Sequence, residues 1–157
     1  MEQQVSKRKA EPYNFRNLAL WQRGQGLALS IIKMTEALPT TQAARTIARQ
    51  VVASSGSIGA NIAEGHGRYS VATYRNHLSI ARGSVAETDS WLDLLQRAGF
   101  IAPTLAADLH RECETLLAGL TRQMQALGAK LRSEKGSRIG ENTPEYSTDK
   151  WPDESMP

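Results

Sequence analysis

Residues 71–97 read VATYRNHLSIARGSVAETDSWLDLLQR, and this stretch decides the fold class. Its apolar and small side chains alternate steps of four and three without a break, at Tyr74, Leu78, Ala81, Val85, Thr88, Leu92 and Leu95. A repeat that averages about 3.5 residues is typical of the seam of a helix packed in a bundle. The stretch therefore predicts a long helix that begins after Ser70 and is closed by Gly99.

Three more helices are predicted on either side of this stretch. Helical apolar spacing covers residues from about 14 or 17 to 37, about 41–64, and from Pro103 to about 132. The connections are short, which makes successive helices antiparallel. We therefore expect an all-α, antiparallel up-down-up-down four-helix bundle over residues 13–133. Residues 1–12 are expected to be a flexible N-terminal arm, and residues 134–157 a disordered acidic tail.

The second helix contains the one stretch that local propensity disfavours. Residues 53–57 read ASSGS, and glycine costs about 1 kcal/mol in a helix interior relative to alanine. The apolar spacing continues in register on both sides, so we predict an unbroken helix. Small side chains there would let a neighbouring backbone approach closely. We expect Gly65 and Gly67 to end this helix with a left-handed cap and a short turn.

Charge is distributed unevenly along the chain. The net charge is +3, but residues 134–157 carry three basic and six acidic side chains, so the remainder carries +6. Within residues 13–133 the basic side chains are eleven arginines and two lysines. Arginine presents a planar fork that suits phosphate, so a basic, arginine-dominated body favours an acidic partner, with nucleic acid first. The alternative is that these arginines are ordinary solvated helix residues.

Arginine pairs recur at spacings that place both members on one helix face. Since they are grouped along the second and third helices, five are predicted to contact nucleic acid: Arg45, Arg49, Arg68, Arg75 and Arg82.

No catalytic or metal-binding pattern is present. The three histidines and the single cysteine, Cys113, lack the spacing of metal ligands, and Cys113 lies on the apolar stripe of the fourth helix as a small core residue. No P-loop or nucleophile–base arrangement is present either. We therefore predict no enzymatic activity, no cofactor and no metal. Asn61 and Glu64 are interpreted as structural polar residues, with ligand binding as the alternative.

Neither a membrane span nor a secretory signal is recognisable. No apolar run approaches the roughly 20 residues that cross a bilayer, and the first nine residues lack an apolar centre. The expected compartment is the cytoplasm, without membrane association.

Several of these motifs together resemble one protein family. They are Phe15-x-x-Leu18-x-Leu20-Trp21-Gln22, Pro39, Gln50, the string SIGANIAEG at 57–65, Tyr74-x-x-x-Leu78-x-Ile80-Ala81-x-Gly83-Ser84-x-x-Glu87, Gly99 and Ile101. Over residues 13–131 the chain resembles the four-helix-bundle proteins encoded by bacterial ribosomal-RNA intervening sequences. The same fold family includes the accessory variability determinant proteins of diversity-generating retroelements.

The resemblance implies a homopentameric ring of four-helix protomers. In the retroelement branch it further implies binding of RNA, with DNA as a second candidate, and association with a reverse transcriptase that copies template RNA. The alternative function is a protein-interaction scaffold of the intervening-sequence branch without direct nucleic-acid contact, in which the arginines form ion pairs between subunits. The acidic tail departs from the family pattern, and it either competes for a basic surface or keeps the ring soluble.

Overall fold

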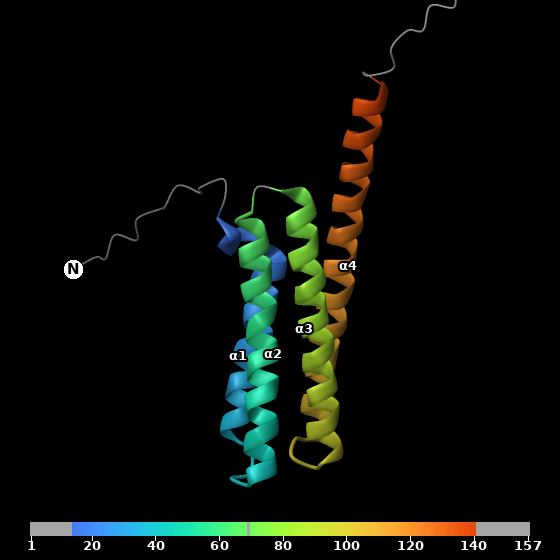
Figure 1. Cartoon of the computed structure of the whole chain (residues 1–157). Helices are drawn as coiled ribbons and strands as arrows, with labels where there is room; N and C mark the ends of the chain where they lie inside the picture. Colours follow the sequence, from blue (N-terminus) through green and yellow to red (C-terminus); the bar gives the residue numbers. More distant parts are fainter. Residues whose placement is uncertain (1–13, 69, 141–157) are drawn as a thin grey trace, which may run out of the picture.

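The computed structural model describes residues 14–68 and 70–140, and in that part of the chain all regular structure is helical (Figure 1). Five elements follow one another: the 3₁₀ turn η1 (Phe15–Asn17), α1 (Ala19–Glu36), α2 (Gln42–His66), α3 (Val71–Arg97) and α4 (Pro103–Gly140). The four α-helices run alternately up and down (Figure 1), with α2 packed most extensively against α3, and α3 against α4. The prediction of an all-α four-helix bundle is confirmed.

Capping side chains, a glycine turn and a first-turn proline mark the ends of the helices. The side chains of Thr41 and Ser70 accept hydrogen bonds from the backbone N–H groups of Ala44 and Thr73, at 3.2 and 3.4 Å, and so cap α2 and α3. Gly99 has a φ of 73°, the left-handed conformation that glycine adopts most easily, and turns the chain out of α3. Pro103 begins α4, as predicted.

The core is aliphatic and lies along the predicted stripes. Six of the seven seam residues of α3 are buried and Tyr74 is half-buried, which confirms the pattern that decided the fold class. In the first turn of α4 the buried residue is Ala106, whereas Leu105 is 41% exposed. The fully buried part of the α4 stripe runs through Leu116 and Leu120.

The serine-rich stretch of α2 forms a polar contact with α3 inside the bundle. Helix α2 continues without a break through residues 53–57. The hydroxyls of Thr88 and Ser54 lie 3.0 Å apart, and those of Ser84 and Ser57 lie 3.2 Å apart. Side chains this short can bond to each other only when the two backbones are close. The predicted close approach is therefore confirmed, and the hydroxyls pair across it.

The glycines at the end of α2 have a role other than the predicted one. Gly67 caps the helix with a φ of −74°, so the expected left-handed cap is wrong. Gly65 lies inside α2 and is buried, and a Cβ placed on it would lie only 2.6 Å from Cβ of His77 and 3.0 Å from Cδ2 of Tyr74. Glycine is needed here because α3 packs against the backbone of α2.

Helix α4 is longer than the periodicity predicts. It continues past Arg132 to Gly140, so residues 134–140, assigned to the tail from their composition, are helical. In Figure 1 the last turns of α4 extend beyond the ends of α2 and α3. The predicted arm, 1–12, and the rest of the predicted tail, 141–157, lie outside the described residues. None of the helices described has an apolar stretch long enough to cross a membrane.

Candidate nucleic-acid interface

Charge is separated along the hairpin that α3 and α4 form. Because the two helices are antiparallel, residues 70–86 of α3 lie beside residues 115–133 of α4, as the contacts of Arg75 with Met124 and of Arg82 with Thr121 show. These two segments together contain five basic side chains and no acidic one. The other half of the hairpin, residues 87–114, contains six acidic and two basic side chains. One end of the hairpin is therefore strongly basic and the other acidic.

Two predicted arginines lie in the basic half, and each is held by one atom of its guanidinium group. Nε of Arg75 donates a hydrogen bond to the backbone carbonyl of Met124 at 3.3 Å. Nε of Arg82 donates to Oγ1 of Thr121 at 3.1 Å. Both bonds use the inner nitrogen and orient the planar group, while the two outer nitrogens remain available. This is the side of the guanidinium that binds phosphate or carboxylate with two parallel hydrogen bonds.

A third arginine comes from α4. Gly128 is buried, and a Cβ placed on it would lie 3.5 Å from Nε of Arg75 and 3.6 Å from Nη1 of Arg132. The two nitrogens are therefore at most about 7 Å from each other. No carboxylate forms an ion pair with Arg75, Arg82 or Arg132 among residues 14–68 and 70–135. Such a pair of cations favours an anion between them.

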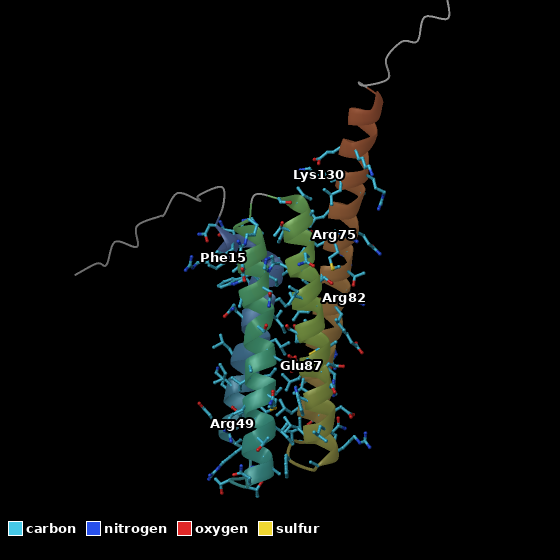
Figure 2. All side chains as sticks on the ribbon, viewed as in Figure 1. Phe15, Arg49, Arg75, Arg82, Glu87 and Lys130 are labelled. Atoms are coloured by element: carbon cyan, nitrogen blue, oxygen red, sulfur yellow. The ribbon has the colours of Figure 1, made fainter. Side chains whose placement is uncertain are left out.

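The surface between the two helices is shallow and lined by hydrogen-bond donors. Two hollows of about 320 and 250 Å³ share Arg75 and Met124 and so lie next to each other along the two helices. The remaining lining residues are Ala72, Asn76, Ser79, Arg82, Thr121 and Gln125. We call this surface, together with Arg132 on α4, the arginine groove. Figure 2 shows Arg75, Arg82 and Lys130 following one another along α3 and α4.

The structure separates the other three predicted arginines from this groove. Arg45 and Arg49 lie near the start of α2, and Figure 2 shows Arg49 at the opposite end of the bundle from Arg75. Arg68 follows α2 and forms an ion pair with Glu64 one turn earlier. The five arginines that the sequence grouped therefore occupy three places, and only Arg75 and Arg82 share a surface.

Asn61 and Glu64, the predicted structural polar residues, both form contacts within the protein. Asn61 is half-buried, and its Nδ2 donates to the carbonyl and the hydroxyl of Ser57 at 2.9 and 3.0 Å. Glu64 is half-exposed, and its hydrogen bond from Arg68, followed by the charge of His77, lowers the pKa of its carboxyl below the ordinary 4.5. Both hydrogen bonds of Asn61 lie within α2. The polar contacts that fix how α2 sits against α3 are instead those of Ser57 with Ser84 and of Ser54 with Thr88.

The polar groups near Cys113 do not form a nucleophilic site. Nδ1 of His110 lies 2.6 Å from Oδ1 of Asp89, which resembles the base and orienting group of a catalytic triad. However, burial, with a further contribution from Asp89, raises the pKa of Cys113 to about 12. The thiol is fully buried and stays protonated at neutral pH. Within the part of the chain that the structure describes, no cluster of three His, Cys, Asp or Glu side chains could hold a metal ion.

Arg132 is the groove residue that helical spacing within single helices missed. Its relation to Arg75 arises from the packing of α4 on α3. A signal for it is present in the sequence, since residues 70–86 and 115–133 both lack acidic residues. Aligning the two segments as an antiparallel pair would have brought these cations together.

Comparison with known proteins identifies relatives of most of the bundle. The model of one family, 23S rRNA-intervening sequence protein, matches residues 16–122. A crystal structure from Bacteroides thetaiotaomicron, described as a protein of unknown function from the S23 ribosomal protein family, is similar at a TM-score of 0.64 and 26% identity. That similarity covers 68% of this chain and 98% of the other. A search of curated proteins finds no significant match.

Proposed function

The chain belongs to the 23S rRNA-intervening sequence protein family, and on this premise we propose that it is a non-enzymatic accessory protein that binds nucleic acid in the arginine groove. The single observation that supports the proposal is the convergence of Arg75, Arg82 and Arg132 on a surface where no carboxylate pairs with them among the residues described. Elsewhere on the bundle, Arg23 pairs with Glu112 and Arg68 with Glu64.

The form of the groove favours recognition of the sugar-phosphate backbone. Its hollows are open to solvent, and its donors are arginine, asparagine, serine, threonine and glutamine side chains. Such groups bind phosphate and sugar oxygens in any sequence. The expected ligand is therefore RNA, with DNA bound by the same contacts, and the affinity should depend strongly on salt and weakly on base sequence.

Association with a reverse transcriptase and assembly into a homopentameric ring complete the proposal. Both are carried over from the family resemblance alone. A ring would repeat the arginine groove once per protomer, so that one long nucleic acid can contact several grooves. This repetition would raise the overall affinity without any new type of contact.

Salt-dependent binding tests the proposal directly. We would measure the affinity of a fluorescent single-stranded RNA for the full chain and for Arg75→Gln/Arg82→Gln between about 50 and 200 mM salt, the range over which phosphate contacts lose most of their affinity. Each lost phosphate contact should reduce the slope of log K against log salt by about 0.7, so the double variant should lose about 1.4. Arg45→Gln/Arg49→Gln is the matched control, because it removes the same charge at the far end of the bundle.

Two results would overturn the assignment. One is an affinity for RNA that is independent of salt, and the other is an equal loss of slope in the control variant. Arg75→Lys adds a test of geometry, since it keeps the charge but loses the Nε bond to Met124. We expect this variant to keep most of the slope and to bind more weakly.

The runner-up, a protein-interaction scaffold, is favoured by a different surface. On α1, Leu29 is 57% and Ile32 is 42% exposed. On α2 a shallow hollow of about 340 Å³ is lined by Ala48, Arg49, Val52 and Ala53. Mass measurement of the assembly with and without RNA separates the two functions. A scaffold would assemble and show no RNA-bound species.

A further inference from the structure

We propose that residues 141–157 bind the arginine groove of their own chain and compete there with nucleic acid. The effect on RNA binding rests on the proposed function, whereas the contact between residues 141–157 and the groove does not. It would make the groove self-regulated, because binding of RNA would first require displacement of an acidic segment of the same protein.

The groove has an excess of positive charge that the described part of the protein does not balance. Five basic and no acidic side chains lie in the two helical segments that form it. The outer nitrogens of Arg75 and Arg82 are free of the bonds that hold Nε, and a carboxylate matches them as well as a phosphate does. The acidic half of the same hairpin would repel an acidic segment, which leaves the groove as the complementary surface.

Residues 141–157 have the complementary composition. They carry five carboxylates and one basic side chain, Lys150. Four of the carboxylates recur at every fourth position, namely Glu141, Glu145, Asp149 and Asp153, with Glu154 next to the last. Tyr146 and Trp151 lie between them, and an aromatic ring can stack on a guanidinium group. Acidic and aromatic side chains together are the features by which a peptide would recognise a row of arginines.

The connection to α4 places these residues within reach. From Gly140, the groove is about 18 Å away at Gly128 and about 28 Å away at Thr121, at 1.5 Å per helical residue. The nine residues from Gly140 to Asp149 can span at most about 30 Å, and those to Asp153 about 43 Å. The carboxylates at 149, 153 and 154 can therefore reach the groove, although α4 projects away from the bundle (Figure 1).

Attachment to the same chain makes even a weak contact effective. A segment joined by a short connection acts at an effective concentration of about 1 mM. If the isolated contact had a Kd of about 0.1 mM, about nine grooves in ten would be occupied, and the apparent affinity for RNA would fall about tenfold. Since both contacts are electrostatic, this difference should disappear at high salt.

The first experiment tests the contact without nucleic acid. A carbodiimide joins a lysine to a carboxylate only when the two are in direct contact, and Gln125→Lys places an amine on the lining of the groove. In this full-length variant we expect cross-links between residue 125 and residues 141–157 at low salt. They should be lost in 1 M salt and strongly reduced in Arg75→Gln/Arg82→Gln. Lys33, on α1, is the control and should form none.

The second experiment measures competition in the full chain. Neutralising the five carboxylates (Glu141→Gln, Glu145→Gln, Asp149→Asn, Asp153→Asn and Glu154→Gln) should raise the affinity for single-stranded RNA about tenfold at low salt and leave it unchanged at high salt. A matched control neutralises exposed carboxylates of the acidic half of the hairpin, by Asp93→Asn, Asp108→Asn and Glu114→Gln. It should change the affinity much less.

The outcomes separate this inference from the proposed function. Absence of the cross-links together with an unchanged affinity overturns the inference, whether or not RNA binds. Cross-links in a protein that binds RNA in neither form support the contact and refute the proposed function. Cross-links that join two different chains, detected in a mixture of isotope-labelled and unlabelled protein, overturn the assignment to the same chain.

Discussion

Substitution of Gly65 by alanine tests the packing of α2 against α3 more sharply than any other change. Alanine is the better helix former by about 1 kcal/mol, so propensity alone predicts stabilisation. The structure predicts the opposite, because the new Cβ would lie 2.6 Å from Cβ of His77 and 3.0 Å from a ring carbon of Tyr74. Cβ of His77 is attached directly to the backbone of α3, so only a movement of one helix away from the other relieves the contact.

The size of the effect follows from these two terms. Forcing an extra carbon into a packed interior costs about 1–3 kcal/mol, and a contact that no side-chain rotation can relieve belongs at the upper end. After the gain in propensity, Gly65→Ala should destabilise the protein by about 2 kcal/mol. Gly56 and Gly83 are the controls, because both are helical and exposed and a Cβ on either meets nothing within 4 Å. Each control should stabilise by up to about 1 kcal/mol.

The assay is unfolding by urea and by heat, followed by circular dichroism at one fixed protomer concentration. The expected gap of about 3 kcal/mol between Gly65→Ala and Gly56→Ala corresponds to about 6–12 °C in Tm for a chain of this size. Fixing the concentration removes any contribution of assembly to the comparison. A Gly65→Ala protein as stable as the controls would refute the close approach of the two helices.

Three other predictions concern single groups. Thr88→Val removes a buried hydroxyl bonded to Ser54 and to the carbonyl of Ser84, at 3.0 and 2.8 Å, and should cost about 1–3 kcal/mol in urea unfolding; adding Ser54→Ala should cost less than the sum of the two single changes. Because the native pKa of Glu64 lies below 4.5, its stabilising contribution is present above that pH and is lost as the pH falls through the lowered value. The difference in urea midpoint between the parent and Glu64→Gln should therefore shrink as the pH falls below about 4.5, and a difference that grows there would contradict the sign. Cys113, with a pKa of about 12, should not react with a thiol reagent at pH 8 in the native protein and should react fully in denaturant; rapid native labelling would show that the site opens.

The amino-acid sequence by itself determined the fold class, because that depends on periodicity. The unbroken steps of four and three in α3, its start after Ser70 and the turn at Gly99 are local features, and each predicted an element that the structure contains. The end of α4 was misjudged because composition suggested a tail beyond Arg132, whereas the helix continues to Gly140. Composition describes average behaviour and carries no information about where a hydrogen-bonded helix stops.

Only the tertiary structure decided which arginines share a surface. Helical spacing relates residues within one helix, so it paired Arg75 with Arg82, but it could neither separate Arg45 and Arg49 from them nor add Arg132. Those relations depend on how the helices pack, which brings the guanidinium groups of Arg75 and Arg132 to Gly128 from different helices. The same reason explains Gly65, which local rules predicted as a cap and which the packing of α3 requires to be without a side chain.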